Sequence, residues 1–99
     1  MFDIGPYKKE IERLCETFGI AKLEIFGSAV TDEFRPDSDV DVVIEFDGSG
    51  GNHFHRYFDL KYALEELFGR EVDIVVGDAM RNPYFKAEVK RTKKPVYVG

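Results

Sequence analysis

The chain has 99 residues, of which 43% are hydrophobic and 33% charged, and its net charge is −5. This composition predicts one globular domain spanning residues 1–99 and excludes a disordered chain. The sequence has no secretory signal pattern, no apolar run near the roughly 18 residues that a membrane span requires, and one cysteine, too few for an internal disulfide. We therefore expect a cytoplasmic protein without a membrane partner.

The charge is unevenly distributed along the chain. Residues 79–99 contain six basic residues and one acid, whereas the rest of the chain contains 8 basic and 18 acidic residues. An acidic body argues against stable nucleic-acid binding and is compatible with a cation site. The basic segment 81–94 has two interpretations: a solvated helix end whose cations oppose the helix dipole, or a surface for a partner.

Hydrophobic periodicity predicts the elements of the first half. Apolar residues at helical spacing indicate an amphipathic helix over 6–18, with Pro6 at its first position. Residues 20–26 alternate with period two, which predicts a strand. Residues 27–38 predict a loop with a short helical turn, and residues 39–46, rich in β-branched side chains, predict a second strand.

The second half continues the mixture of helices and strands. The patterns predict a flexible connection over 47–52, a helix over 53–68, a strand over 71–76, a helix over 78–92 and an edge strand over 95–98. Asp78 is the expected N-cap of the last helix, with Pro83 in its first two turns. The fold class is therefore α/β (α+β), a small mixed β-sheet with helices packed against it.

Two carboxylates open the second predicted strand, where apolar residues are expected. Asp39 and Asp41 share one face of the strand and would repel each other, a conflict that Mg²⁺, which prefers oxygen ligands, resolves. Asp73 repeats the anomaly in the third strand. If these strands are neighbours, three carboxylates can hold two metal ions about 3.5–4 Å apart, the arrangement used for in-line phosphoryl displacement. Glu71 shares a face with Asp73 and competes for the third position; for each acid alone, exposure on the surface is the simpler interpretation.

Gly27 and Ser28 directly follow the first predicted strand. Glycine lets a phosphate approach the backbone closely, and the serine hydroxyl and the following amides can donate to phosphate oxygens. A Gly-Ser pair alone is more often an ordinary turn. Its place at a strand end, 12 residues before Asp39, favours a phosphate-binding turn joined to the carboxylates.

These motifs resemble the signature of the DNA polymerase β-like nucleotidyltransferase superfamily. The matching segments are Phe26-Gly27-Ser28, Pro36-Asp37-Ser38-Asp39-Val40-Asp41-Val42 and Val72-Asp73-Ile74. The length and the final strand resemble the minimal nucleotidyltransferases, the MNT family, and the resemblance covers nearly the whole chain. It implies the polymerase β-like nucleotidyltransferase fold, a nucleoside triphosphate substrate whose β- and γ-phosphates lie on Gly27 and Ser28, and two Mg²⁺ ions bound by Asp39 and Asp41. Asp73 would bind the catalytic metal and help to deprotonate the attacking hydroxyl.

The MNT resemblance also implies a partner. Many members act as the antitoxin of a HEPN-domain toxin, and the family transfers AMP from ATP to a tyrosine of that toxin. One alternative is a catalytically weak subunit that neutralises the HEPN partner by binding alone. Another is nucleotidyl transfer to a small molecule, although 99 residues leave no room for a substrate-binding domain. The chain has Ala29 where members often carry Arg, and Arg35 from the same loop is a candidate replacement.

Overall fold

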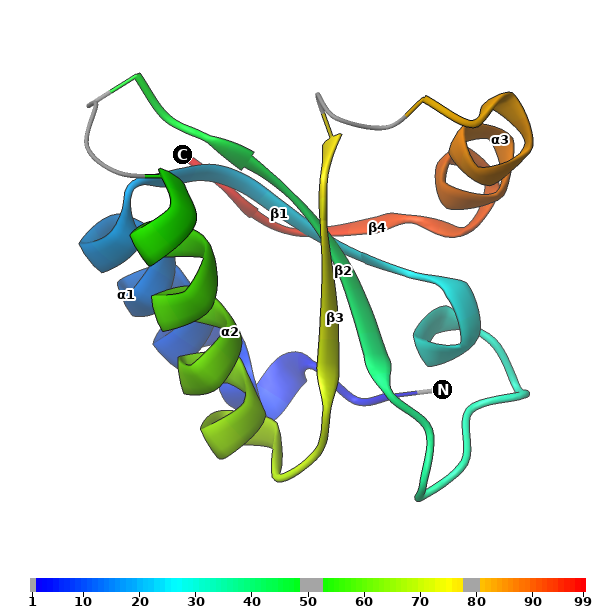
Figure 1. The fold of residues 1–99 in the computed structure, drawn as a ribbon. Helices are drawn as coiled ribbons and strands as arrows, with labels where there is room; N and C mark the ends of the chain where they lie inside the picture. The colour runs from blue at the N-terminus through cyan, green and yellow to red at the C-terminus, as the bar shows by residue number, and fades with distance from the viewer. Residues whose placement is uncertain (1, 49–52, 78–80) are drawn as a thin grey trace.

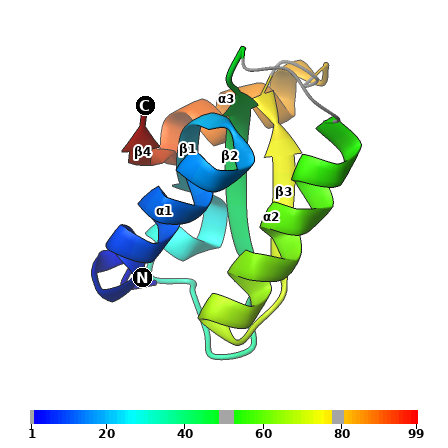
Figure 2. The ribbon, with the colours of Figure 1, turned by 90° about the vertical axis from the view of Figure 1, so that its left-hand side faces the viewer.

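The computed structural model describes residues 2–48, 53–77 and 81–99 (Figure 1). A four-stranded mixed sheet has α1 and α2 on one face and α3 on the other (Figures 1 and 2). The elements are η1 (Gly5–Tyr7), α1 (Lys8–Phe18), β1 (Ile20–Phe26), η2 (Gly27–Val30), β2 (Val40–Phe46), α2 (His53–Phe68), β3 (Val72–Val76), α3 (Pro83–Thr92) and β4 (Lys94–Val98). This architecture confirms the predicted fold class.

The sheet has the strand order β3-β2-β1-β4, so β1 and β2 are its central strands. β1 is antiparallel to both β2 and β4, whereas β2 and β3 are parallel. Parallel neighbours require a crossover connection, and α2 provides it between β2 and β3. This crossover brings the third predicted strand beside the second, as the carboxylate hypothesis requires.

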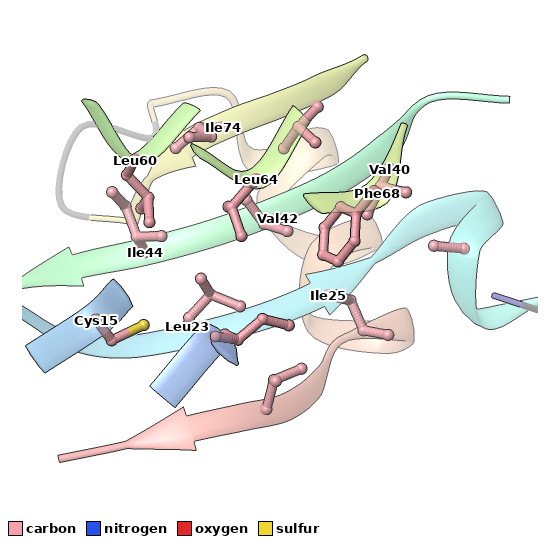
Figure 3. Packing of buried hydrophobic residues seen from close by; sticks show 14 of the residues in the cluster. Cys15, Leu23, Ile25, Val40, Val42, Ile44, Leu60, Leu64, Phe68 and Ile74 are labelled. Carbon is pink, nitrogen blue, oxygen red and sulfur yellow. The ribbon is translucent and has the colours of Figure 1, made fainter. Parts of the chain in front are cut away.

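The main core lies between the sheet and the pair of helices α1 and α2 (Figure 3). Leu60, Leu64 and Phe68 project from successive turns of α2, which is the spacing of a single helix face. They pack with Val40, Val42 and Ile44, alternate residues of β2 that share its helix-covered face. The intervening residues of β2 therefore face the side of the sheet that carries α3.

Cys15 belongs to this core. It is buried on the face of α1 that also buries Ile11, one turn earlier. Burial, together with the negative charges of Glu12 and Glu16, raises the pKa of its thiol to about 12. The side chain is thus a protonated, apolar packing group at neutral pH, in agreement with its position in the amphipathic pattern.

The first helix begins later than the sequence pattern predicts. Residues 5–7 form a 3₁₀ turn, in which the Tyr7 amide donates to the carbonyl of Ile4 at 3.0 Å, and the α-helix starts at Lys8. Pro6 fits this tight turn because its missing N–H is not needed at a helix start. The helix ends at Phe18, as predicted, and the following Gly19 caps it in the left-handed conformation with φ 69°.

The third helix begins at Pro83, so the prediction of a helix starting at Asp78 is wrong. Asn82 is extended, and its side-chain oxygen accepts hydrogen bonds from the amides of Tyr84 (2.9 Å) and Phe85 (3.2 Å). A residue before proline is disfavoured in helical conformation, so the helix cannot extend backwards through residue 82. Asp78 itself lies outside the described residues, as do residues 49–52 of the predicted connection. Within the described ranges, no helix is long and apolar enough to cross a membrane.

Candidate active site

Asp41 and Asp73 lie side by side on neighbouring strands. The parallel register of β2 and β3 pairs these two residues directly. Val40 and Val42 on β2, and Val72 and Ile74 on β3, are buried, so strand alternation places both aspartates on the opposite face of the sheet, the one that carries α3. The register thus selects Asp73, rather than Glu71, as the residue that meets Asp41.

The electrostatics of Asp41 reflect this crowding. Its pKa is raised from 3.8 to about 6, first by burial, then by the negative charge of Asp73, by a hydrogen bond with Asp73, and by the charge of Asp39. Asp73 and Asp39 are both acids that the sequence pattern predicts as candidate metal ligands. Uncompensated negative charge at this point favours either a bound proton or a bound cation.

The carboxylates fit Mg²⁺ as partial ligands rather than as a complete cage. In the part of the chain that the structure describes, no three carboxylate, imidazole or thiol groups converge closely enough to hold a metal ion by themselves. Asp39 lies just before β2 and acts on Asp41 through its charge. Mg²⁺ is usually bound by one or two carboxylates together with substrate phosphates and water, so hard oxygen donors of this kind suit it. Asp39, Asp41 and Asp73 are the side chains that would hold it.

The Gly27 turn lies against Asp41. Phe26, the last residue of β1, is the register partner of Asp41, and the chain then turns into η2. Gly27 has φ +68°, and a Cβ at this position would lie 2.8 Å from Oδ2 of Asp41. Only glycine allows both this backbone conformation and this approach. Ser28 follows within η2, so the predicted phosphate-binding pair and the carboxylates lie together at the end of β1 and the start of β2.

Arg70 holds the loop that leads to Asp39. Its Nη1 donates to the carbonyl of Ser38 at 3.0 Å and to that of Arg35 at 3.3 Å. Its guanidinium lies 4.7 Å from the centre of the Phe34 ring and 5.5 Å from that of Phe2. The side chain therefore joins the loop before β2 to the turn before β3, and so fixes both strands that carry the carboxylates.

Replacing Arg70 with alanine is expected to cost about 2 kcal/mol of stability, since it removes hydrogen bonds from a charged group and two ring contacts. We also expect about a tenfold loss of Mg²⁺-dependent nucleotide binding, because the start of β2 loses its anchor. Urea unfolding and titration calorimetry measure the two effects. Arg70→Lys keeps the charge but not the planar group, and should fall between the alanine variant and wild type. An Arg70→Ala protein that binds nucleotide normally would contradict this role.

Two residues at the site could not be found from local sequence patterns. Arg70 follows a helix-ending glycine, a place where a basic residue needs no special explanation. Thr92 ends α3, yet its Oγ1 accepts a hydrogen bond from the Gly27 amide at 2.9 Å. The two partners are 65 residues apart, so no periodicity or motif relates them.

Comparison with known proteins identifies the family. A family model described as a nucleotidyltransferase domain matches residues 8–96. The chain belongs to the nucleotidyltransferase-domain family. The nucleotidyltransferase is 32% identical over 95 residues to the protein adenylyltransferase MntA of Thermococcus cleftensis, an alignment that covers 96% of this chain and 88% of that relative.

Solved structures agree with this assignment. A minimal nucleotidyltransferase superposes on the nucleotidyltransferase with a TM-score of 0.75 and 32% identity, covering 91% of this chain and 89% of the other. The complex of a tri-AMPylated Shewanella oneidensis HEPN toxin with an MNT antitoxin gives a TM-score of 0.66 at 14% identity, with 95% and 71% of the chains covered. At 14% identity, the similarity to this toxin–antitoxin complex shows a shared fold alone. Together these findings confirm the resemblance drawn from the motifs and identify the protein as a nucleotidyltransferase.

Proposed function

We propose that this nucleotidyltransferase transfers AMP from ATP to a tyrosine hydroxyl of a HEPN-domain partner and thereby acts as its antitoxin. The observation that carries the proposal is the position of Asp41, which pairs with Asp73 on one side and lies against the Gly27 turn on the other. The turn and the paired carboxylates are therefore adjacent, as a site that holds a triphosphate and acts on its α-phosphate requires. The similarity to MntA, a protein adenylyltransferase, supports the reaction class.

The chemistry requires positioning and charge neutralisation rather than a covalent intermediate. Ser28 and the turn hold the β- and γ-phosphates. The acceptor oxygen forms a bond to the α-phosphorus beside the paired carboxylates, while the bond from that phosphorus to the bridging oxygen breaks and pyrophosphate leaves. The hydroxyl proton passes to a carboxylate of the pair, with Asp73, the more exposed of the two, nearest the incoming acceptor. Bound Mg²⁺ would supply the positive charge that offsets the phosphates and carboxylates.

The partner assignment is supported by two considerations. The fold is shared with an MNT antitoxin that is bound to an AMPylated HEPN toxin. In addition, the paired carboxylates lie on the sheet face opposite α1 and α2, and Asp73 is exposed there, as an acceptor presented by another protein requires.

The test uses ATP labelled at the α-phosphate, Mg²⁺ and the protein encoded by the adjacent gene. We expect the label to appear on a tyrosine of that protein, and to be absent without Mg²⁺ or with Asp39→Asn/Asp41→Asn. Asp59→Asn/Glu66→Gln removes two exposed charges from α2 instead and is the matched control, which should leave labelling intact. Absence of label, together with full neutralisation of the partner by the Asp39→Asn/Asp41→Asn protein, would show that binding alone is the activity.

A further inference from the structure

We infer that Thr92 is a positioning residue that fixes the phosphate-binding turn from the far end of the sequence. The inference rests on the proposed function, because it assigns a role within the same nucleotide site. The Gly27 amide donates to Oγ1 of Thr92 at 2.9 Å, and the Thr92 hydroxyl in turn donates to the carbonyl of Glu88 at 2.9 Å. Thr92 is 8% exposed, and both bonds are partly buried.

The second of these bonds is a common local one, since threonine in a helix often bonds the carbonyl four residues earlier. It has a consequence here, because it uses the single hydroxyl proton and leaves the oxygen as an acceptor for Gly27. The direction of both hydrogen bonds is therefore fixed: Gly27 donates to Thr92, and Thr92 donates to Glu88. A valine at this position would keep the shape of the side chain but leave the Gly27 amide without its partner.

The rest of α3 supports this role. Its two buried residues are Val89 and Thr92. Val89 packs against Phe26, the residue before Gly27, and against Val43 of β2. The helix thus contacts the end of β1 through an apolar group and the following residue through a hydrogen bond.

The link also determines which groups can meet a phosphate. Because the Gly27 amide is already engaged by Thr92, the donors available to the triphosphate come from Ser28 and the residues after it. The hydrogen bond holds Gly27 at φ +68°, the conformation that places the turn against Oδ2 of Asp41. Thr92 therefore sets the distance between the phosphate-binding turn and the carboxylates without touching the nucleotide.

The experiment compares Thr92→Val with Thr92→Ser, which keeps the hydroxyl, and with Thr17→Val, a matched change at an exposed site on α1. Calorimetric titration with ATP and Mg²⁺ should show a dissociation constant about tenfold higher for Thr92→Val than for wild type. The reason is that a small displacement of a binding group has a large effect on affinity. Thr92→Ser should recover most of the affinity, and Thr17→Val should match wild type. If the role of Thr92 were purely structural, Thr92→Val would have a lower melting temperature than wild type. Its ATP affinity, measured well below that temperature, would be unchanged.

Amide hydrogen exchange gives a second reading that needs neither nucleotide nor activity. The Gly27 amide should be protected in wild type and in Thr92→Ser, and should exchange faster in Thr92→Val. A Gly27 amide that exchanges freely in wild type overturns the inference even if Thr92→Val does not fold. Unchanged ATP affinity in a folded Thr92→Val protein also overturns it. Wild-type protein that binds no ATP with Mg²⁺ refutes the proposed function itself, an outcome distinct from both.

Discussion

Replacing Asp41 with asparagine is expected to reduce AMP transfer at least a thousandfold while making the metal-free protein more stable. The loss of activity follows because the substitution removes a negatively charged oxygen ligand from the point at which the proposed mechanism brings the cation and the α-phosphate together. The gain in stability follows because Asp41 is half-buried beside Asp73 and Asp39, whose charges oppose its ionisation. Asparagine keeps the shape of the side chain and removes this repulsion.

The stability effect has a defined pH dependence. The pKa of Asp41 is about 6 in the folded protein and 3.8 as the reference value, so the folded state binds this proton more tightly than the unfolded state. Its contribution to stability is complete below pH 3.8 and is lost as the pH rises through 6. Asp41→Asn should therefore resemble wild type near pH 4 and exceed it at pH 7 by about 1 kcal/mol, after allowing for partial exposure to solvent.

Urea unfolding at several pH values, with a chelator present, measures this difference. Asp59→Asn on α2 is the control and should show no such rise, since it removes an exposed acid from the other side of the molecule. In excess Mg²⁺ the advantage of Asp41→Asn should shrink, because a bound cation offsets the same repulsion in wild type. An Asp41→Asn protein less stable than wild type at pH 7 would mean that Asp41 is not crowded by its neighbours.

Replacing Gly27 with alanine is expected to abolish most nucleotide binding and to lower stability by more than a left-handed backbone alone explains. The new Cβ would lie 2.8 Å from Oδ2 of Asp41, so either the turn or the carboxylate must move. The left-handed conformation adds a cost of about 1 to 2 kcal/mol for any residue with a side chain. Both effects act at the turn beside Asp41, where the proposed function places the triphosphate, and we expect transfer to fall about a hundredfold.

Gly69 provides the matched control. Its φ is +67°, nearly that of Gly27, but a Cβ there would have nothing within 4 Å. Gly69→Ala should therefore show only the backbone cost, with ATP affinity unchanged. Thermal unfolding and calorimetric titration of the two variants separate the strain from the contact with Asp41. Equal losses in both would indicate that the contact has no effect.

The elements of this fold that local patterns determine were predictable from the sequence. The stripe of Leu60, Leu64 and Phe68 specifies both α2 and the face that it buries. Asp41 and Asp73 were predictable as candidates only in combination with Asp39 and the Gly27-Ser28 turn, because each acid alone is explained as readily by the solvent face of a half-buried strand. Their roles in metal binding and catalysis remain predictions that the variants above address.

Features that depend on distant parts of the chain could not be predicted. Period-two alternation places Glu71 and Asp73 on one face, and only the register of the parallel pair decides between them. The start of α3 was predicted too early because Asp78 has the character of a cap, whereas Pro83 fixes the beginning of the helix and Asn82 caps it. The bonds of Thr92 and Arg70 join segments that are remote in sequence, where local propensity carries no information.

The parallel pairing of β2 with β3 also has a consequence for insertions and deletions. The pairing of Asp73 with Asp41 depends on the number of residues between α2 and β3. Deleting one residue from 70–71 would turn β3 over, which would carry Asp73 into the apolar layer beneath α2 and expose Ile74. Deleting two would restore the faces but shift Asp73 by about 6.6 Å along its neighbour. A change of length in this short connection is therefore more damaging than any single substitution within it, and a variant library that preserves the site should hold that length fixed.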